Sequence, residues 1–141
     1  MYLLDTDHLS ALEWASGVPG QNLIARLNKL SINDVATTII SFEEQMRGWL
    51  SMLSKARSLS DQVTVYGRLN RMLDNYRKID VLGFDMRAVS IFERLQSSRL
   101  KVGTMDLKIA AIALAHDATV LTRNLKDFNR VPRLRLENWT E

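Results

Sequence analysis

The sequence predicts an α/β protein of three layers, in which helices cover both faces of a mainly parallel sheet. Short apolar, β-branched runs alternate along the chain with longer segments whose apolar residues recur at helical spacing. Right-handed crossovers between parallel strands bring the carboxyl end of every strand to one edge of the sheet. Open α/β folds bind their ligands outside that edge, so functional residues are expected there.

The predicted strands are short and apolar. Residues 1–4 are too few for a helix and end at Asp5, and the β-branched run VATTII (35–40) forms the second strand. Three further strands are predicted at residues 79–85, 118–122 and 134–136, the last of them at an edge of the sheet.

The first two helices flank a break. The first begins at Thr6 and includes Trp14, and the segment 17–20, which holds two glycines and a proline, ends it. Residues 21–30 resume the helical pattern with one apolar face.

The middle of the chain predicts a long helical pair. It begins at Ser41 and extends to about Lys78, with a break near residues 58–61. Helices at 86–96 and 105–116 follow, and the second is rich in alanine, which allows close packing on a sheet.

Length and composition predict one globular domain, residues 1–141. Of these residues 46% are apolar and 25% charged, with a net charge of +3. The sequence contains no cysteine, which excludes disulfides, Cys-ligated metals and thiol nucleophiles. No apolar run approaches the ~20 residues of a membrane span, and the start MYLLDTD lacks signal-peptide features. We therefore expect a soluble, cytoplasmic protein that does not contact a membrane.

Acidic and carboxamide side chains fall where predicted elements meet the functional edge. Asp5 ends the first strand, Glu44 lies in the first turn after the second, and Asp106 lies in the first turn of the helix before the fourth. Asn124 and Asp127 follow the fourth strand. Clustered carboxylates repel one another unless a cation lies among them, and Mg²⁺ and Mn²⁺ prefer oxygen ligands. The pattern predicts a divalent-metal site for phosphoryl chemistry.

Each of these residues also has a purely structural explanation. Asp5 suits a helix N-cap. Ser41 and Glu44 form the capping-box pattern S-x-x-E, which taken alone explains Glu44 better than catalysis does. Asp106 suits a helix N-terminus because of the helix dipole, and the two residues after the fourth strand suit a turn. The convergence of four separate elements favours a functional site.

The histidines and the basic residues give weaker signals. His8 is expected to be structural or exposed, and His116 to end a helix, where a cation suits the dipole. Residues 45–78 carry seven basic residues against two acidic ones, and the C-terminal segment carries several more. Basic surface beside an acidic centre suits a nucleic acid backbone, although the charge alone is better explained by a solvated helix face.

Three segments, in order, resemble the PIN-domain proteins. They are MYLLDTDHLS, IISFEEQMRG and VGTMDLKIAAIALAHDATVLTRNLKDFNRVPRLRLENW. The last resembles the C-terminal signature of the VapC-type toxins of bacterial toxin–antitoxin pairs almost throughout. The resemblance covers essentially the whole chain and implies a PIN-like (Rossmann-like) fold.

This resemblance implies a Mg²⁺- or Mn²⁺-dependent endoribonuclease that forms a homodimer and is neutralised by a cognate antitoxin protein. Asp5, Glu44 and Asp106 match the family's three principal acids; an acid four residues before a glycine selects Glu44 over Glu43. The fourth acidic position falls on Asn124.

The implied mechanism is hydrolysis of an RNA phosphodiester by metal-activated water. Asp5 and Asp106 would hold the ion, with Glu44 binding it or orienting the water, and Asn124 or Asp127 would complete the shell. Thr6, which matches the family's small hydroxyl residue, and the basic residues Arg123 and Lys126 are expected to contact the RNA.

Two other functions compete with this one. LLDTD resembles the start of a haloacid-dehalogenase-type phosphotransferase, but His8 and Leu9 replace the glycine and threonine expected there. An inactive PIN-like binding or regulatory module is the second alternative, with Asn124 as a sign of decay. If an antitoxin binds, we expect its groove on the long helices, with the candidates Trp49, Leu50 and Leu53, although burial in the core explains them equally well.

Overall fold

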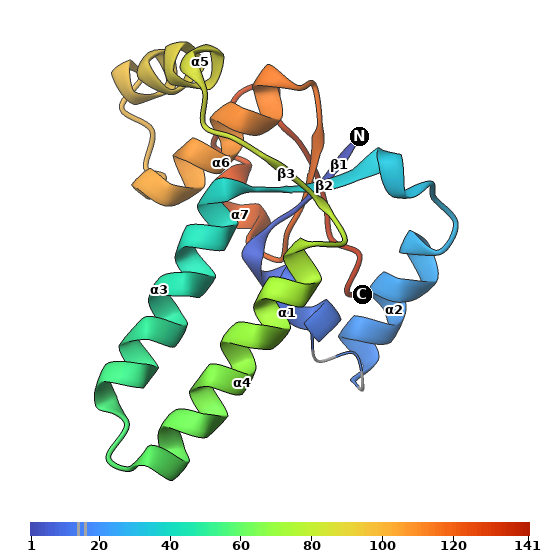
Figure 1. Ribbon diagram of the computed structural model, residues 1–141. Helices are drawn as coiled ribbons and strands as arrows, with labels where there is room; N and C mark the ends of the chain where they lie inside the picture. Colours follow the sequence, from blue (N-terminus) through green and yellow to red (C-terminus); the bar gives the residue numbers. More distant parts are fainter. Residues whose placement is uncertain (14, 16) are drawn as a thin grey trace.

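A parallel sheet forms the centre of the molecule (Figure 1). The computed structural model describes residues 1–13, 15 and 17–141, and Trp14, expected in the first helix, lies outside the described residues. Within them the strands take the order β3-β2-β1-β4-β5, and every neighbouring pair is parallel. The strands are β1 (Tyr2–Leu4), β2 (Val35–Thr38), β3 (Asp80–Leu82), β4 (Thr119–Leu121) and β5 (Arg135–Glu137).

Helices connect these strands in the alternation that the sequence predicts. They are α1 (Thr6–Glu13), α2 (Val18–Leu27), α3 (Ile39–Lys55), α4 (Leu59–Tyr76), α5 (Met86–Ser97), α6 (Thr104–Ala115) and α7 (Leu125–Phe128), with a 3-10 helix at Ile32–Asp34. Of the helices in the described residues, none combines the length and the apolar character that a membrane crossing requires.

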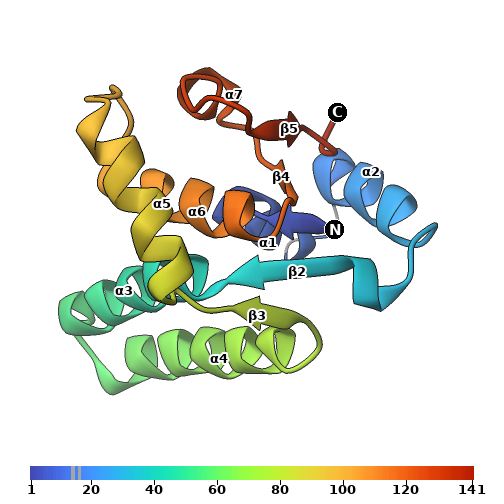
Figure 2. The ribbon, with the colours of Figure 1, turned by 90° about the horizontal axis from the view of Figure 1, so that it is seen from above.

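Alternation along the strands divides the core between the two faces of the sheet. Leu3 and Val120 are partners in register and lie in the cluster packed by α5, α6 and α7, whereas Leu4 and Leu121 lie in the cluster packed by α1 and α2. Figure 2 shows α5 and α6 on one side of the strands and α2 on the other. The predicted three-layer α/β/α architecture is confirmed.

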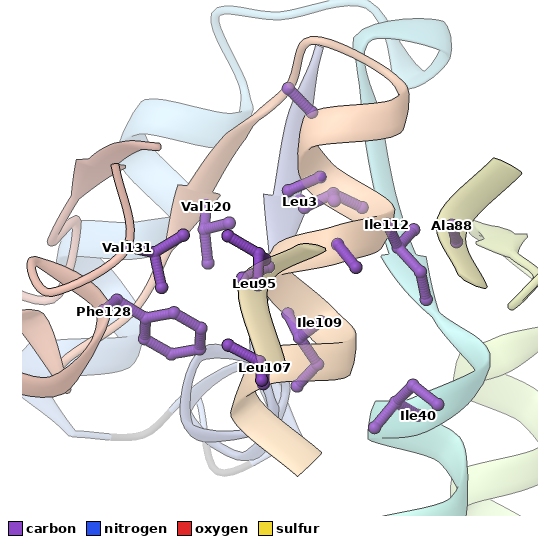
Figure 3. Packing of buried hydrophobic residues seen from close by; sticks show 14 of the residues in the cluster. Leu3, Ile40, Ala88, Leu95, Leu107, Ile109, Ile112, Val120, Phe128 and Val131 are labelled. Atoms are coloured by element: carbon purple, nitrogen blue, oxygen red, sulfur yellow. The ribbon is translucent and has the colours of Figure 1, made fainter. Parts of the chain in front are cut away.

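Helix α6 is buried on nearly every side. Residues 109–113 are at most 1% exposed, and Figure 3 shows Ile109 and Ile112 among side chains from the sheet and from α5. Three of these five residues are alanines, whose small side chains let the helix lie close to the strands. Because α6 is fixed in this way, its N-terminal turn is held at the edge of the sheet.

Helices α3 and α4 form the predicted long pair, which lies side by side and extends away from the sheet (Figure 1). The ring of Phe42 meets that of Tyr76 edge-on at 5.1 Å between centroids, and the guanidinium of Arg68 lies over the Trp49 ring. Because α3 begins directly after β2, Glu44 on its second turn stays close to the sheet, and α4 runs back to β3.

The predicted start of α3 is wrong. The β-branched residues Ile39 and Ile40 begin the helix instead of continuing β2, and Thr38 is the N-cap because its hydroxyl accepts from the Ser41 amide at 3.1 Å. Ser41 is therefore inside the helix, and the capping box with Glu44 does not form. An N-cap threonine satisfies an otherwise unpaired amide, which here outweighs the β propensity of the two isoleucines.

Candidate active site

The carboxyl ends of β1 and β4 meet at the predicted edge. These strands are parallel neighbours, and the Asp5 amide extends their ladder by donating to the Leu121 carbonyl at 3.0 Å. The Asp5 carboxylate, only 6% exposed, accepts from the Thr6 amide at 2.8 Å and from the Thr122 hydroxyl at 2.8 Å. Asp5 is thereby fixed at the base of the site.

Glu44 reaches the same place from α3. The Thr6 hydroxyl donates to its carboxylate (Oγ1 to Oε1, 3.2 Å), so the two residues lie in contact although 38 positions separate them. The sequence predicted Glu44 on the first turn of this helix. It lies on the second turn instead, because α3 begins at Ile39.

The remaining polar residues come together around one carboxamide. Asn124 Nδ2 donates to Asp106 Oδ2 and to Asp127 Oδ2, both at 3.2 Å. Asp106 lies in the first turn of α6, as predicted, and Asp127 lies in α7. Asn124 stands at the N-cap of α7 without a side-chain cap, and its Nδ2 lies between the two carboxylates.

Burial and like charge raise the pKa values of the three principal acids. The pKa of Asp5 rises from 3.8 to about 7, first because of burial and then because of the Asp7 charge. Burial is also the main reason that the pKa of Glu44 and that of Asp106 lie above their ordinary values. The negative charge of Asp106 adds to the rise at both Asp5 and Glu44, so the three carboxyls share one field.

The groups at this edge that could bind a metal are carboxylate, carboxamide and hydroxyl oxygens, which suit a hard divalent cation. As these side chains stand, no group of three or more His, Asp or Glu residues in the described part of the chain is arranged to hold a metal ion. The Asn124 amide and the two threonine hydroxyls lie against the carboxylate oxygens. A cation bound to these carboxylates would take the place of some of these hydrogen bonds.

Comparison with known proteins now assigns the fold. Residues 2–134 match the family model of the PIN domain. The chain belongs to the PIN-domain family. The family match favours this fold over the haloacid-dehalogenase alternative, and the resemblance seen in the sequence is confirmed.

Curated relatives of this PIN-domain chain are ribonucleases. Ribonuclease VapC2 of Rickettsia felis is 35% identical over 66 residues, which is 44% of this chain and 49% of that protein. Ribonuclease VapC of Rickettsia bellii is 43% identical over 44 residues, 31% of this chain and 33% of that protein. The matched segments thus span at most about half the length of these relatives.

Solved structures of related fold cover nearly the whole chain. VapBC2 from Rickettsia felis, solved bound to a DNA fragment from their promoter, is 26% identical, with a TM-score of 0.74 and 98% of each chain covered. DNA-bound VapBC from Salmonella typhimurium has a TM-score of 0.76 at 22% identity, over 98% of this chain and 97% of that one, and therefore supports the fold alone.

The PIN-domain site contains residues that the sequence did not single out. Asp7, which sequence reasoning left without a role, accepts from the Arg123 amide at 2.9 Å and from His8 Nδ1 at 2.7 Å. The Thr122 hydroxyl joins Asp5 to the turn, because its oxygen also accepts from the Asn124 amide at 3.0 Å. The contacts of Asp5 and Asp7 with this turn connect residues more than 110 positions apart, so local patterns do not reveal them; the one signal was a polar threonine directly after β4.

The basic residues expected at the rim are exposed. Arg123 and Lys126 lie in the turn after β4 and in α7, where the chain reaches solvent. Arg130, which sequence reasoning did not assign to the site, contacts Asp127 (Nη1 to Oδ1, 3.4 Å) and donates to the Lys101 carbonyl at 2.6 Å.

Proposed function

We propose that this PIN-domain protein is a divalent-metal-dependent endoribonuclease and the toxin of a toxin–antitoxin pair. The observation that carries the proposal is the shared field of Asp5, Glu44 and Asp106. Three separate elements deliver these carboxyls to one edge, where burial and the charges of neighbouring acids raise their pKa values. Such an arrangement costs stability without a cation, which is typical of a site kept for chemistry.

Mg²⁺ or Mn²⁺, when bound, would supply an activated water and would neutralise phosphate charge. Asp5 and Asp106 would hold the ion, and Glu44 would bind it or orient the water. Asn124 or Asp127 would complete the shell; Asn124 already contacts both Asp106 and Asp127, so it is placed to position them.

RNA is the substrate we propose, because the curated relatives that match this chain are named ribonucleases. Arg123 and Lys126 are exposed next to Asn124, where their charges would attract a phosphate backbone. Thr6 contacts Glu44 inside the site, so a direct contact with RNA requires its hydroxyl to turn from that carboxylate.

The partner we propose is a protein antitoxin, since a matching VapBC structure is described as a member of the VapBC family of toxin–antitoxin systems. An apolar cavity of about 410 Å³ between α1, α2 and the end of α4 offers room for its side chains. The lining of this cavity does not include the three groove candidates Trp49, Leu50 and Leu53. Leu50 is 48% exposed on α3, whereas Trp49 and Leu53 are half-buried. The expected homodimer stays a prediction.

Ile32 provides the test of this partner surface. It lines the cavity and is 64% exposed, so Ile32→Glu leaves the core intact while placing a charge at the mouth. We expect this variant to lose co-purification with the protein encoded beside its gene. Met86→Glu, a matched change at a residue 75% exposed on α5, should keep it. If both variants still co-purify with that protein to the same extent, the cavity is not part of the interface.

The nuclease itself is tested by cleavage of total and transfer RNA with Mg²⁺, with Mn²⁺ and with EDTA. We expect metal-dependent fragments from the wild type and none from Asp5→Asn or Asp106→Asn. Asp80→Asn is the control, because Asp80 is exposed at the start of β3, on the opposite edge of the sheet. Induced expression should stop growth of a bacterial host for the wild type and for Asp80→Asn only.

Each alternative result has a distinct meaning. Equal cleavage by the wild type and Asp5→Asn would show a contaminating nuclease and would refute the assigned site. Absence of cleavage, together with growth arrest by both proteins, would favour the inactive binding module over the enzyme.

A further inference from the structure

His8 is fully buried and bonded at both ring nitrogens. The Trp139 amide donates to its Nε2 at 3.1 Å, and its Nδ1 lies 2.7 Å from Asp7 Oδ1. A backbone amide is only a donor, so Nε2 must be the unprotonated nitrogen, and the ring proton is on Nδ1. His8 therefore donates to Asp7, and the orientation of this bond is fixed by the C-terminal segment.

Asp7 uses its two oxygens in opposite directions. Oδ1 accepts from His8, while Oδ2 accepts from the Arg123 amide at 2.9 Å and lies 3.3 Å from the Thr122 hydroxyl. Asp7 thus joins the first turn of α1 to the turn that follows β4. Its side chain is 30% exposed, whereas that of His8 has no exposed surface, so the buried ring is the rigid end of the pair.

The turn held by Asp7 presents Asn124 to the site. Thr122 and Arg123 are the two residues before Asn124, and the Asn124 amide donates to the Thr122 hydroxyl oxygen. The Asn124 side chain then bridges Asp106 and Asp127. A continuous chain of hydrogen bonds therefore connects Trp139 to these two carboxylates through His8, Asp7 and the turn.

We propose that His8 and Asp7 are positioning residues for the active site, which hold residues 122–124 so that the Asn124 carboxamide stays between Asp106 and Asp127. The inference rests on the proposed nuclease function for its kinetic consequence, but not for its structural one. Neither residue touches the substrate in this role; both act through the turn.

The competing explanation is that His8 only anchors the C-terminal segment through Trp139. Two substitutions separate the explanations, because each keeps one of the two bonds. In His8→Asn the side-chain amide nitrogen takes the place of Nδ1 and donates to Asp7, while the Trp139 amide is left unpaired. In His8→Gln the side-chain oxygen takes the place of Nε2 and accepts from Trp139, while Asp7 loses its donor.

Asn22 supplies a control for anchoring alone. Its Nδ2 donates to the Thr140 carbonyl at 3.1 Å, so Asn22→Ala loosens the same segment without touching Asp7. We expect Asn22→Ala and His8→Asn to lower the thermal midpoint. We expect His8→Gln to keep a midpoint closer to that of the wild type.

Cleavage should follow the opposite order. For His8→Gln we expect kcat to fall about tenfold or more with KM unchanged, as for other residues that orient metal-site groups. His8→Asn should recover most of that loss. In ¹⁵N-labelled protein with EDTA, the Arg123 amide and Asn124 carboxamide resonances should shift in His8→Gln and stay near their wild-type positions in His8→Asn and in Asn22→Ala.

Several results would overturn the inference. It fails if kcat follows the thermal midpoint across the three variants, or if His8→Gln leaves the Arg123 and Asn124 resonances in place. A wild type that cleaves no RNA would count against the proposed function only, because the resonance comparison decides the role of His8 and Asp7 without activity.

Discussion

Replacing Asp5 by asparagine should make the metal-free protein more stable above neutral pH while abolishing cleavage. The asparagine side chain fits the contacts of the aspartate: its oxygen accepts from the Thr6 amide, and its amide donates to the Thr122 oxygen. The Thr122 hydroxyl proton can then turn to Asp7 Oδ2, 3.3 Å away. The substitution therefore removes a buried charge and leaves no polar group unpaired.

The magnitude follows from the pKa of Asp5, which is raised from 3.8 to about 7. Below about pH 4 the carboxyl is protonated in both folded and unfolded chains and costs nothing. Between about pH 4 and 7 the unfolded chain releases its proton while the folded chain retains it, so stability falls as pH rises. Above about pH 7 the full cost of about 4 kcal/mol is present, since each pKa unit is worth about 1.4 kcal/mol.

The assay is chemical denaturation of wild type and Asp5→Asn in EDTA at pH 5, 6, 7 and 8. We expect the free energy of unfolding of the variant to exceed that of the wild type by about 2 to 4 kcal/mol at pH 8, and by much less at pH 5. In thermal melts this is about 6 to 12 °C for a chain of this size. Mn²⁺ should narrow the difference, because only the wild type gains a full ligand.

A variant that is less stable than the wild type at pH 8, or a difference that does not change with pH, would refute the reasoning. Either result would mean that Asp5 is not a destabilised carboxylate in the folded protein. Asp80→Asn, at an exposed position, should show no such pH-dependent difference.

Five further substitutions test three separate parts of the structure. Thr38→Ala should cost about 1 kcal/mol of unfolding free energy in urea titrations, since it removes the cap of α3, and Ser41→Ala should cost less. Asn124→Asp should lower the thermal midpoint in EDTA through repulsion by the carboxylates on either side and should gain more from Mn²⁺ than the wild type does. Gly20→Ala should cost about 1 to 3 kcal/mol, because its Cβ would lie 2.6 Å from a carbonyl oxygen of α1, whereas Gly67→Ala, with open space in α4, should gain up to about 1 kcal/mol. Equal effects at the two glycines, or a larger cost at Ser41 than at Thr38, would contradict the packing described.

Periodicity was sufficient to predict the layers, because each strand is marked by a break in the helical pattern. It failed at residues 39–40, where two isoleucines continue an apolar β-branched run but enter a helix. The decision there depends on Thr38, whose hydroxyl is free to cap only once the chain turns away from β2. β propensity alone therefore does not locate the start of this helix, because it does not include the Thr38 cap.

The sequence predicted the acids of the site but not the contacts that hold them. Asp5, Glu44 and Asp106 were found because parallel strands must end at a common edge. Asp7 and Thr122 were not, because each is an ordinary helix-start or strand-end residue until the ends of β1 and β4 come together. Contacts of this kind join distant parts of the chain and are visible only in the folded molecule.

The residues that break local rules lie at this one edge. Asn124 occupies an N-cap position and caps nothing, and Asp5 is a carboxylate with almost no exposed surface beside a second carboxylate, Asp7. Selection for stability alone would favour a neutral residue in place of Asp5, which is the basis of the Asp5→Asn prediction. The hydrogen bonds from His8, Thr6 and the turn after β4 all hold these groups in place, so the ordering contacts are concentrated where the electrostatic cost is greatest. This is expected of a site whose carboxylates are kept to bind a cation and, through it, a phosphate.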